Sequence, residues 1–241
     1  MKGRVNVKVL RSCGLVLVLT LLVVGAAQGA GVNPYWQRMA EGFQNRVVVH
    51  EYVYVHESPD LEVSVRIPQL VGTFDPEWEQ GFNQNLRDRL AAYVTELKEI
   101  AAEAWDLEGE YRPFPYQGIV DFEVKLNRGG LLSIAIVNYV FTGGAHGTTA
   151  HEYINLDLTT GQSISFHALF NTDAELERAA EKIDAKIGEE PDWFFIDKFT
   201  PELFAADQGF FLQDHHAVIC FAHYELAPYA AGVQEFAVPA P

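Results

Sequence analysis

The period of the hydrophobic pattern predicts two strands near the start of the folded part of the chain. Residues 47–56 alternate apolar and polar side chains, and residues 61–67 do so again with a polar residue at every second position. Alternation with a period of two is typical of a strand that has one face exposed to solvent. Ser58-Pro59-Asp60 lies between the two segments and predicts a hairpin turn.

A period of three to four residues then predicts two helices. Apolar side chains recur at these intervals in residues 82–107, and Asp75-Pro76 in front of them predicts the N-terminal cap of a long helix. Such a stripe fits a helix packed across a sheet, which we favour, or a helix paired with a second copy in a coiled-coil dimer. Residues 176–187 repeat the pattern in a shorter helix, for which Asp173 is the predicted cap.

The stretch around which we expect the fold to be organised is residues 131–158. Two runs rich in branched and aromatic residues flank the loop Thr142-Gly143-Gly144-Ala145-His146-Gly147, which predicts two strands joined by a glycine-rich connection. Glycine tolerates positive φ and the close approach of another surface. We therefore expect Gly143, Gly144 and Gly147 to have a structural role in this loop.

The remaining segments complete an α+β chain. Residues 31–44 predict a loose linker, residues 119–127 a further strand, and residues 210–224 a terminal hairpin. Together the segments predict antiparallel sheets packed by one long and one shorter helix. We expect this architecture to have two parts, with a boundary near Thr160.

The first 30 residues have the organisation of a secretory signal. Four basic residues precede an apolar segment at residues 15–24, and small residues follow up to Ala30. The apolar segment is shorter than the roughly 20 residues that a membrane-spanning helix needs. We therefore expect a cleaved signal peptide at residues 1–30 and a secreted, extracytoplasmic protein, with an uncleaved N-terminal anchor as the alternative.

Composition adds a strong negative charge. The chain has 17 basic and 33 acidic residues, and removal of residues 1–30 would leave 13 basic and 33 acidic residues, a net charge of −20. Nucleic acids and anionic lipids require basic patches, so this charge argues against both as partners. It favours a cationic partner, although acidity also keeps a secreted domain soluble.

No residue pattern identifies a catalytic or metal site. Two His-Glu pairs, His50-Glu51 and His151-Glu152, begin a zinc-protease-like string. Tyr54 and Asn155 occupy the position of the second histidine ligand, so neither string is complete. Cys220 lies in an apolar run and is expected to be a small buried hydrophobic residue. We predict no catalytic residues, no metal and no cofactor.

Three strings in order carry a resemblance to a known family. They are NYVFTGGAHG at residues 138–147, YINLDLTTG at residues 153–161 followed by Leu169-Phe170, and YELAPYAAG at residues 224–232. Together they resemble the extracytoplasmic domain pair of RsiV-type anti-sigma factors. The same pair resembles the N-terminal, non-deacetylase part of PdaC-type peptidoglycan deacetylases. The resemblance covers residues 45–238 and implies an α+β fold in two parts.

The same resemblance narrows the expected function. RsiV-type anti-sigma factors carry a cytoplasmic sigma-binding segment before a membrane span, and PdaC-type enzymes carry a separate deacetylase domain. We expect neither here: few residues precede the apolar segment, and Pro76 interrupts the deacetylase-like string Thr73-Phe74-Asp75. The resemblance implies that the extracytoplasmic module is a receptor for lysozyme, a cationic wall-degrading enzyme, which agrees with the negative charge.

These inferences combine in one functional hypothesis. We expect residues 45–160 to form a PdaC-like domain and residues 161–241 an RsiV-like domain. Together they would make a secreted, monomeric, non-enzymatic binding module at the bacterial cell envelope. Its partner would be a cationic wall-active protein such as lysozyme, or peptidoglycan. Two loops place aromatic or rigid residues beside small ones, and their candidate partner-binding residues are His146, Gly144, Tyr224, Pro228 and Tyr229.

Two alternatives stay open at the level of sequence. The chain could be an accessory or structural domain without a ligand, including a dimer formed through the long helix. It could also be an unassigned, metal-independent hydrolase that uses His146 and nearby carboxylates.

Overall fold

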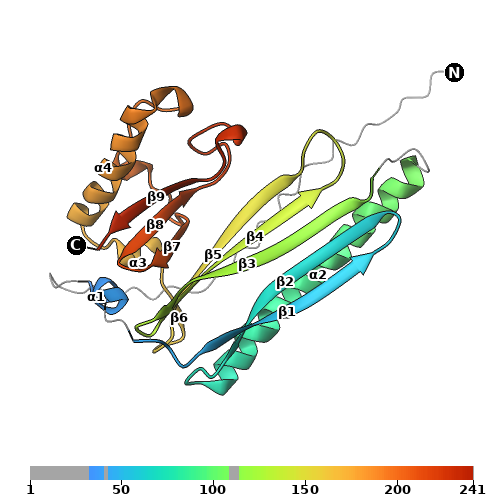
Figure 1. Ribbon diagram of the computed structural model, residues 1–241, viewed down its shortest axis with the longest axis horizontal. Coiled ribbons are helices and arrows are strands. Elements are labelled where there is room, and N and C mark those ends of the chain that lie inside the picture. The colour runs from blue at the N-terminus through green and yellow to red at the C-terminus, as the bar shows by residue number, and fades with distance from the viewer. Residues whose placement is uncertain (1–32, 41–42, 109–113, 241) are drawn as a thin grey trace.

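Two β-sheets organise the computed structural model, which describes residues 33–40, 43–108 and 114–240 (Figure 1). The first sheet has six strands in the order β1-β2-β3-β4-β5-β6. They are β1 (Val48–Glu57), β2 (Leu61–Val71), β3 (Tyr116–Arg128), β4 (Leu131–Phe141), β5 (Thr148–Asp157) and β6 (Gln162–Ser163). The second sheet has three strands, which are β7 (Phe210–Gln213), β8 (His216–Phe221) and β9 (Gln234–Pro239).

Helices cover one face of each sheet. The α-helices in the described ranges are α1 (Pro34–Ala40), α2 (Pro76–Glu108), α3 (Phe166–Leu169) and α4 (Asp173–Glu189), and short 3-10 helices occur at Pro191–Trp193, Pro201–Leu203 and Tyr229–Ala231. Figure 1 shows α2 lying along the first sheet beneath β1 and β2, with α4 beside the second sheet. The α+β class is confirmed. No helix among the described residues has the length and apolar character needed to cross a membrane.

The first hairpin follows the predicted alternation. β1 and β2 pair in antiparallel fashion, and the amide of Ser58 donates a hydrogen bond to the carbonyl of Leu61 at 2.9 Å. Every second residue at the start of β2 is buried, so its apolar face packs inward while its polar face stays wet. The turn at Ser58-Pro59-Asp60 is therefore where the sequence places it.

One strand pair differs from the predicted antiparallel arrangement. β2 and β3 are parallel, whereas the other neighbours in both sheets pair antiparallel. The reason is α2: its 33 residues carry the chain back along the sheet, so β3 starts beside the start of β2. Parallel neighbours need such a long crossover, which a tight turn cannot provide. The first sheet is thus mixed.

The long helix begins and packs as the sequence predicts. The Asp75 carboxylate accepts hydrogen bonds from the amides of Glu77 and Trp78, both at 3.0 Å, and so caps α2. The apolar stripe of α2 is buried against the first sheet and contributes Leu86, Leu90, Tyr93, Val94, Leu97 and Ala101 to its core. The stripe therefore packs on a sheet of the same chain, the alternative that we favour from the pattern.

The segment predicted to be a loose linker contains α1, and α1 packs into the core of the C-terminal part. Trp36 is 2% exposed and Met39 is fully buried there. The Trp36 indole donates to Glu175 at 3.0 Å and meets the Phe170 ring edge-on. Asn33 donates to the carbonyls that end α3. A helix of seven residues is too short to produce a recognisable period, which is why the sequence pattern reads as irregular.

The predicted cap of α4 is displaced by one residue. Thr172, rather than Asp173, is the capping residue, and its hydroxyl accepts from the Glu175 amide. The Glu175 carboxylate accepts from the Thr172 amide in return, which completes a capping box. Asp173 is the first helical residue, where its negative charge faces the positive end of the helix.

A buried ion pair joins α1 to the first sheet. The Arg38 guanidinium donates to both Asp157 oxygens, at 2.7 and 2.8 Å, and to the carbonyls of Gly129 and Gly130 in the β3–β4 turn. Burial would raise the pKa of Asp157, but hydrogen bonds from Arg38 and Thr159 outweigh burial and hold that pKa below its ordinary value. The two parts of the fold are thus held together at this junction.

Candidate functional site

The glycine-rich loop connects β4 to β5, and its glycines have two different roles. Gly143 and Gly144 have φ of 94° and 95°, values that other L-residues rarely adopt. Gly147 has an ordinary φ but is buried, and a Cβ atom placed on it would lie 2.5 Å from the ring of Tyr139. The predicted requirement for positive φ or close approach is therefore met at each position.

We expect valine at Gly143, Gly144 or Gly147 to lower the free energy of unfolding by about 1–3 kcal/mol. At the first two positions the cost is backbone strain, and at Gly147 it is the collision with Tyr139. Denaturant midpoints would measure each effect. Gly188→Ala in α4 is the matched control, since its Cβ meets open space in a helix, where alanine is favoured. Wild-type midpoints for all three valine variants would contradict the structural role.

A second loop, between β8 and β9, faces the first. Tyr224 is 60% exposed and has a φ of 68°, and its amide bonds the carbonyl of Ala227 at 3.1 Å. Pro228 then leads into the 3-10 turn Tyr229–Ala231. The φ of proline is fixed and suits the extended residue before this turn, so the loop presents Tyr229 from a stiff backbone.

Tyr229 is stacked between two histidines. Its ring lies 4.6 Å from that of His146 and 4.5 Å from that of His223, with interplanar angles of 20° and 26°. The Tyr229 hydroxyl donates to the carbonyl of Gly147 at 3.3 Å. His146 Nδ1 is 2.8 Å from the same oxygen and must carry a proton there, because a carbonyl only accepts. These contacts join the glycine loop to the C-terminal part.

The row of rings continues along β5. His151 lies 6.3 Å from His223 and 6.4 Å from Tyr153, and Tyr153 contacts Phe211 of β7 at 6.0 Å between centroids. Burial, followed by the charges of His223 and Lys125, lowers the pKa of His151. We call His146, Tyr229, His223, His151 and Tyr153 the ring row.

The structure brings the predicted site residues together. His146, Tyr224 and Tyr229 lie in one surface region, with Tyr224 and Tyr229 rings 5.7 Å apart, and Gly144 and Pro228 stand in the same two loops. His223 was missed by the sequence reasoning, although it directly precedes Tyr224 in one of the quoted strings. That these residues bind a partner stays a prediction.

Cys220 and the possible metal-ligating side chains were the other candidates for reactive groups. Cys220 is 3% exposed, and burial raises the pKa of its thiol to about 12, so the thiolate is scarce near neutral pH. This agrees with the predicted role as a small hydrophobic residue. Over residues 33–40, 43–108 and 114–240, no group of three or more His, Cys, Asp or Glu side chains is placed to hold a metal ion.

Comparison with known families gives two adjacent matches. Residues 55–149 match the family described as Deacetylase PdaC, and residues 167–240 match the family described as Protein of unknown function (DUF3298). The chain is also 24% identical over 198 residues to the anti-sigma-V factor RsiV of Bacillus subtilis (strain 168). That alignment covers 78% of the chain and 66% of the length of RsiV.

Solved structures share the fold. A member of the DUF3298 family from Bacteroides fragilis NCTC 9343 has a TM-score of 0.60 at 16% identity, covering 80% of this chain and 90% of that one. A DUF3298 family protein from Pseudomonas aeruginosa PAO1 has a TM-score of 0.53 at 19% identity, covering 82% and 93%. At these identities the likeness concerns the arrangement of the backbone.

Proposed function

Since the chain carries a PdaC domain followed by a DUF3298 domain and is a distant homologue of the anti-sigma-V factor RsiV, we propose that it is a binding module of the cell envelope that recognises a cationic wall-active protein of the lysozyme type. Its domains are RsiV-like extracytoplasmic domains. The family resemblance implies a lysozyme-type partner, and the alignment with RsiV over 198 residues is the observation that carries the proposal.

Charge supports the choice of partner. Without residues 1–30 the chain would have a net charge of −20. Long-range attraction between such a surface and a cationic protein accelerates their encounter and disfavours anionic competitors. Charge alone would not select one cationic protein among many, so short-range contacts have to supply the specificity.

The aromatic rings of the two loops support the choice of contact surface. Tyrosine and histidine rings give contact area together with polar atoms, and a tyrosine loses little rotamer entropy on docking. Tyr224 projects from a backbone held by its own turn, and Tyr229 is fixed by two stacked histidines. A surface that is rigid before binding avoids part of the entropic cost of association.

The first experiment identifies the partner class. The purified protein is immobilised and exposed to a cationic lysozyme, and in a parallel arm it is mixed with insoluble peptidoglycan. We expect capture of lysozyme with no co-sedimentation with the glycan. Retention by peptidoglycan alone would replace the protein partner by a wall glycan, and capture of neither would contradict the proposal.

Tyr224→Ala, Tyr229→Ala and His146→Ala are each expected to weaken lysozyme binding about tenfold or more, which corresponds to about 1.4 kcal/mol. Surface plasmon resonance would measure the dissociation constants, and circular dichroism would confirm that each variant is folded. Phe195→Ala is the matched control, because Phe195 is 56% exposed, like Tyr224, but lies outside the two loops. Its affinity should equal that of the wild type.

The pattern of results separates the alternatives. Normal binding by all three variants would place the contact surface elsewhere, and loss of folding in the His146 and Tyr229 variants would make those two residues structural. Tyr224 is 60% exposed and keeps the test informative in that case. Higher salt should reduce the association rate, as expected when opposite charges steer the encounter.

A further inference from the structure

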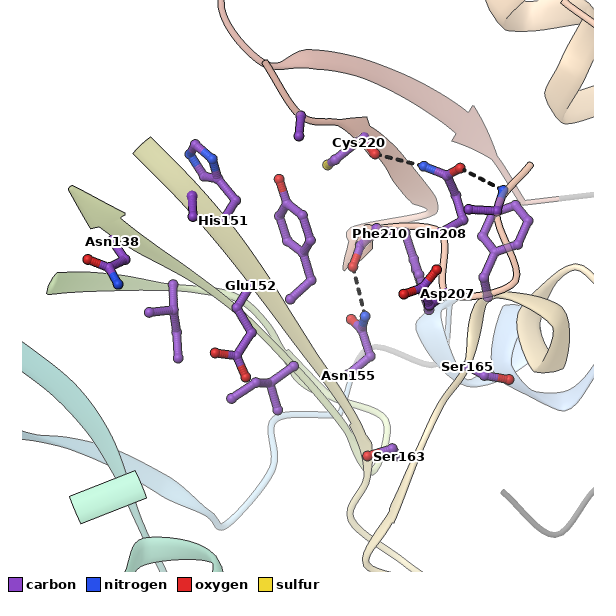
Figure 2. A pocket seen from close by; sticks show the side chains of 18 of the residues that line it. Asn138, His151, Glu152, Asn155, Ser163, Ser165, Asp207, Gln208, Phe210 and Cys220 are labelled. Atoms are coloured by element: carbon purple, nitrogen blue, oxygen red, sulfur yellow. Dashed lines mark hydrogen bonds between the residues drawn. The ribbon is translucent and has the colours of Figure 1, made fainter. Parts of the chain in front are cut away.

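A cleft of about 600 Å³ lies between α2, the first sheet and a loop of the C-terminal part, and it shares His151 and Tyr153 with the ring row. The inner face of the sheet forms its floor with Ile136 and Ile154, and Leu86 and Leu90 of α2 form one wall. The opposite wall is the loop of residues 205–209, which precedes β7. Figure 2 shows Glu152 and Asn138 on the sheet and Asp207 and Gln208 on this loop.

The cleft meets β5 at its edge. Residues 150–155, six in succession, all line it. Side chains of a strand point alternately to opposite faces, so a cleft that touches every residue must run along the side of the strand. Within the described part of the chain, β6 is the strand that pairs with β5 on this side, and that pairing includes only Leu156 and Asp157 of β5. The rest of the β5 edge therefore faces the cleft.

The edge offers backbone hydrogen-bonding groups at a regular spacing. The Asn155 carbonyl accepts from the Ile164 amide at 2.8 Å, so it points away from β4. In an antiparallel strand every second residue directs its N–H and C=O to the same side. The backbone groups of Tyr153 and His151 hence also point toward the cleft, since the β4–β5 register is regular through these residues. This is the pattern that an extended peptide pairs with.

The charges around the cleft are mainly negative. Glu152, Asp207 and Glu225 line it, and the guanidinium of Arg89 lies 2.6 Å from Glu152. The second oxygen of Glu152 is buried and has no hydrogen-bond partner among the described residues. Burial of Glu152 and partial burial of the Glu225 carboxyl raise the pKa of each group, which means that a positive group brought into the cleft would stabilise their ionised forms.

We propose that this cleft binds an extended peptide of alternating apolar and basic residues as an added strand on β5. Apolar side chains on one face of the peptide would contact Leu86 and Leu90, beside Ile136 on the floor. Basic side chains on the other face would reach Asp207 and Glu225 at the mouth of the cleft, where both are exposed. The site shares His151 and Tyr153 with the ring row and Glu225 with the β8–β9 loop, but the proposal does not depend on the proposed recognition of lysozyme.

The test uses a labelled, end-blocked peptide of alternating valine and lysine, about seven residues long, a typical strand length. Fluorescence anisotropy would measure its binding to the folded protein. The same peptide with glutamate in place of lysine tests charge. A third version, methylated on the backbone nitrogens that would pair with β5, tests strand addition. We expect each control peptide to bind at least tenfold more weakly. Equal binding of the methylated peptide, or no binding of the first one, would overturn the proposal.

Two variants test the edge itself. His151→Pro removes one backbone N–H at a strand edge, where proline is tolerated, and His151→Ala removes the side chain while keeping that N–H. We expect the proline variant to bind the peptide at least tenfold more weakly than the alanine variant, which is its reference. Equal affinities would contradict strand addition. If circular dichroism shows that the proline variant does not fold, binding of the methylated peptide to the wild-type protein tests strand addition instead.

Charge and location are tested with matched double variants. Asp207→Asn with Glu225→Gln should weaken binding of the lysine peptide about tenfold. Glu189→Gln with Asp192→Asn changes the net charge equally, at the exposed end of α4 and in the 3-10 helix that follows it, and should have no effect. Equal losses of affinity for the two double variants would show that only the net charge attracts the peptide, and would contradict a binding site in this cleft. Tyr229→Ala should bind the peptide normally, so the failure of this proposal and that of the lysozyme proposal are distinguishable.

Discussion

Asp157→Ala is expected to lower the free energy of unfolding by about 3–5 kcal/mol. The substitution removes the carboxylate that accepts two hydrogen bonds from Arg38, whose side chain is only 19% exposed. The guanidinium would keep its bonds to the carbonyls of Gly129 and Gly130 but would lose the ion pair with Asp157. Removal of one partner of a largely buried ion pair is among the more costly single substitutions.

Chemical denaturation of the two proteins at neutral pH would measure this loss. Glu51→Ala is the matched control, because it also removes a carboxylate from an arginine, Arg66, but at an ion pair whose side chains are 48% and 51% exposed. We expect a change of less than about 1 kcal/mol for that variant. Similar losses of unfolding free energy for the two substitutions would show that the Arg38–Asp157 pair stabilises the fold no more than an exposed ion pair does.

The same ion pair predicts a pH dependence. The folded-state pKa of Asp157 lies below its ordinary value of 3.8, so the unfolded chain binds this proton more readily than the folded one does. The stabilisation is therefore complete above about pH 4–5 and is lost as the pH falls through the folded-state pKa. Asp157→Ala should make the acid-induced loss of stability shallower. Parallel curves of unfolding free energy against pH for wild type and variant would contradict this assignment.

Trp36→Ala is expected to lower the free energy of unfolding by about 3–5 kcal/mol. The indole is 2% exposed, meets Phe170 edge-on and donates to Glu175, so its removal leaves a cavity and an acceptor without its donor. Trp36→Phe keeps most of the apolar contact and should cost about 1–3 kcal/mol, the range for a lost buried hydrogen bond.

Thermal and chemical unfolding would test this result. Trp193→Ala is the control, since Trp193 is 53% exposed and surface substitutions usually change stability by less than about 0.5 kcal/mol. If Trp36→Ala were as mild as Trp193→Ala, α1 would contribute little to the core, and its apparent burial would have no energetic consequence.

Local signals account for what the sequence predicts correctly. The alternation in β1 and β2, the stripe on α2 and the cap at Asp75 each depend on residues within a few positions of one another. The structural role of the glycine loop could also be predicted from the sequence, because glycine marks backbone positions that other residues avoid. The loops carrying His146 and Tyr229 were predicted as binding loops because each places a rigid or aromatic residue beside small ones, and the sequence alone contains no sign of their stacking.

The features that the sequence did not predict depend on contacts between residues far apart in the chain. The parallel β2–β3 pair depends on the path of α2 over the sheet, and the burial of α1 depends on residues far along the chain. The acidic cleft combines Glu152 with Asp207 and Glu225. These residues do not recur at a regular interval in the sequence, so no sequence pattern could group them. Such sites become visible once the two parts are packed together.

The position of α1 also sets an order of events during synthesis. Asn33 and Trp36 contact residues that follow them by 135 and 139 positions, so α1 leaves the ribosome long before its partners exist. Contacts with so large a sequence separation form late, because closing a long loop costs entropy before any contact compensates for it. Trp36 and Met39 therefore remain accessible to other chains until the last helix and sheet have been made. Docking of α1 is thus the folding step with which aggregation competes most directly.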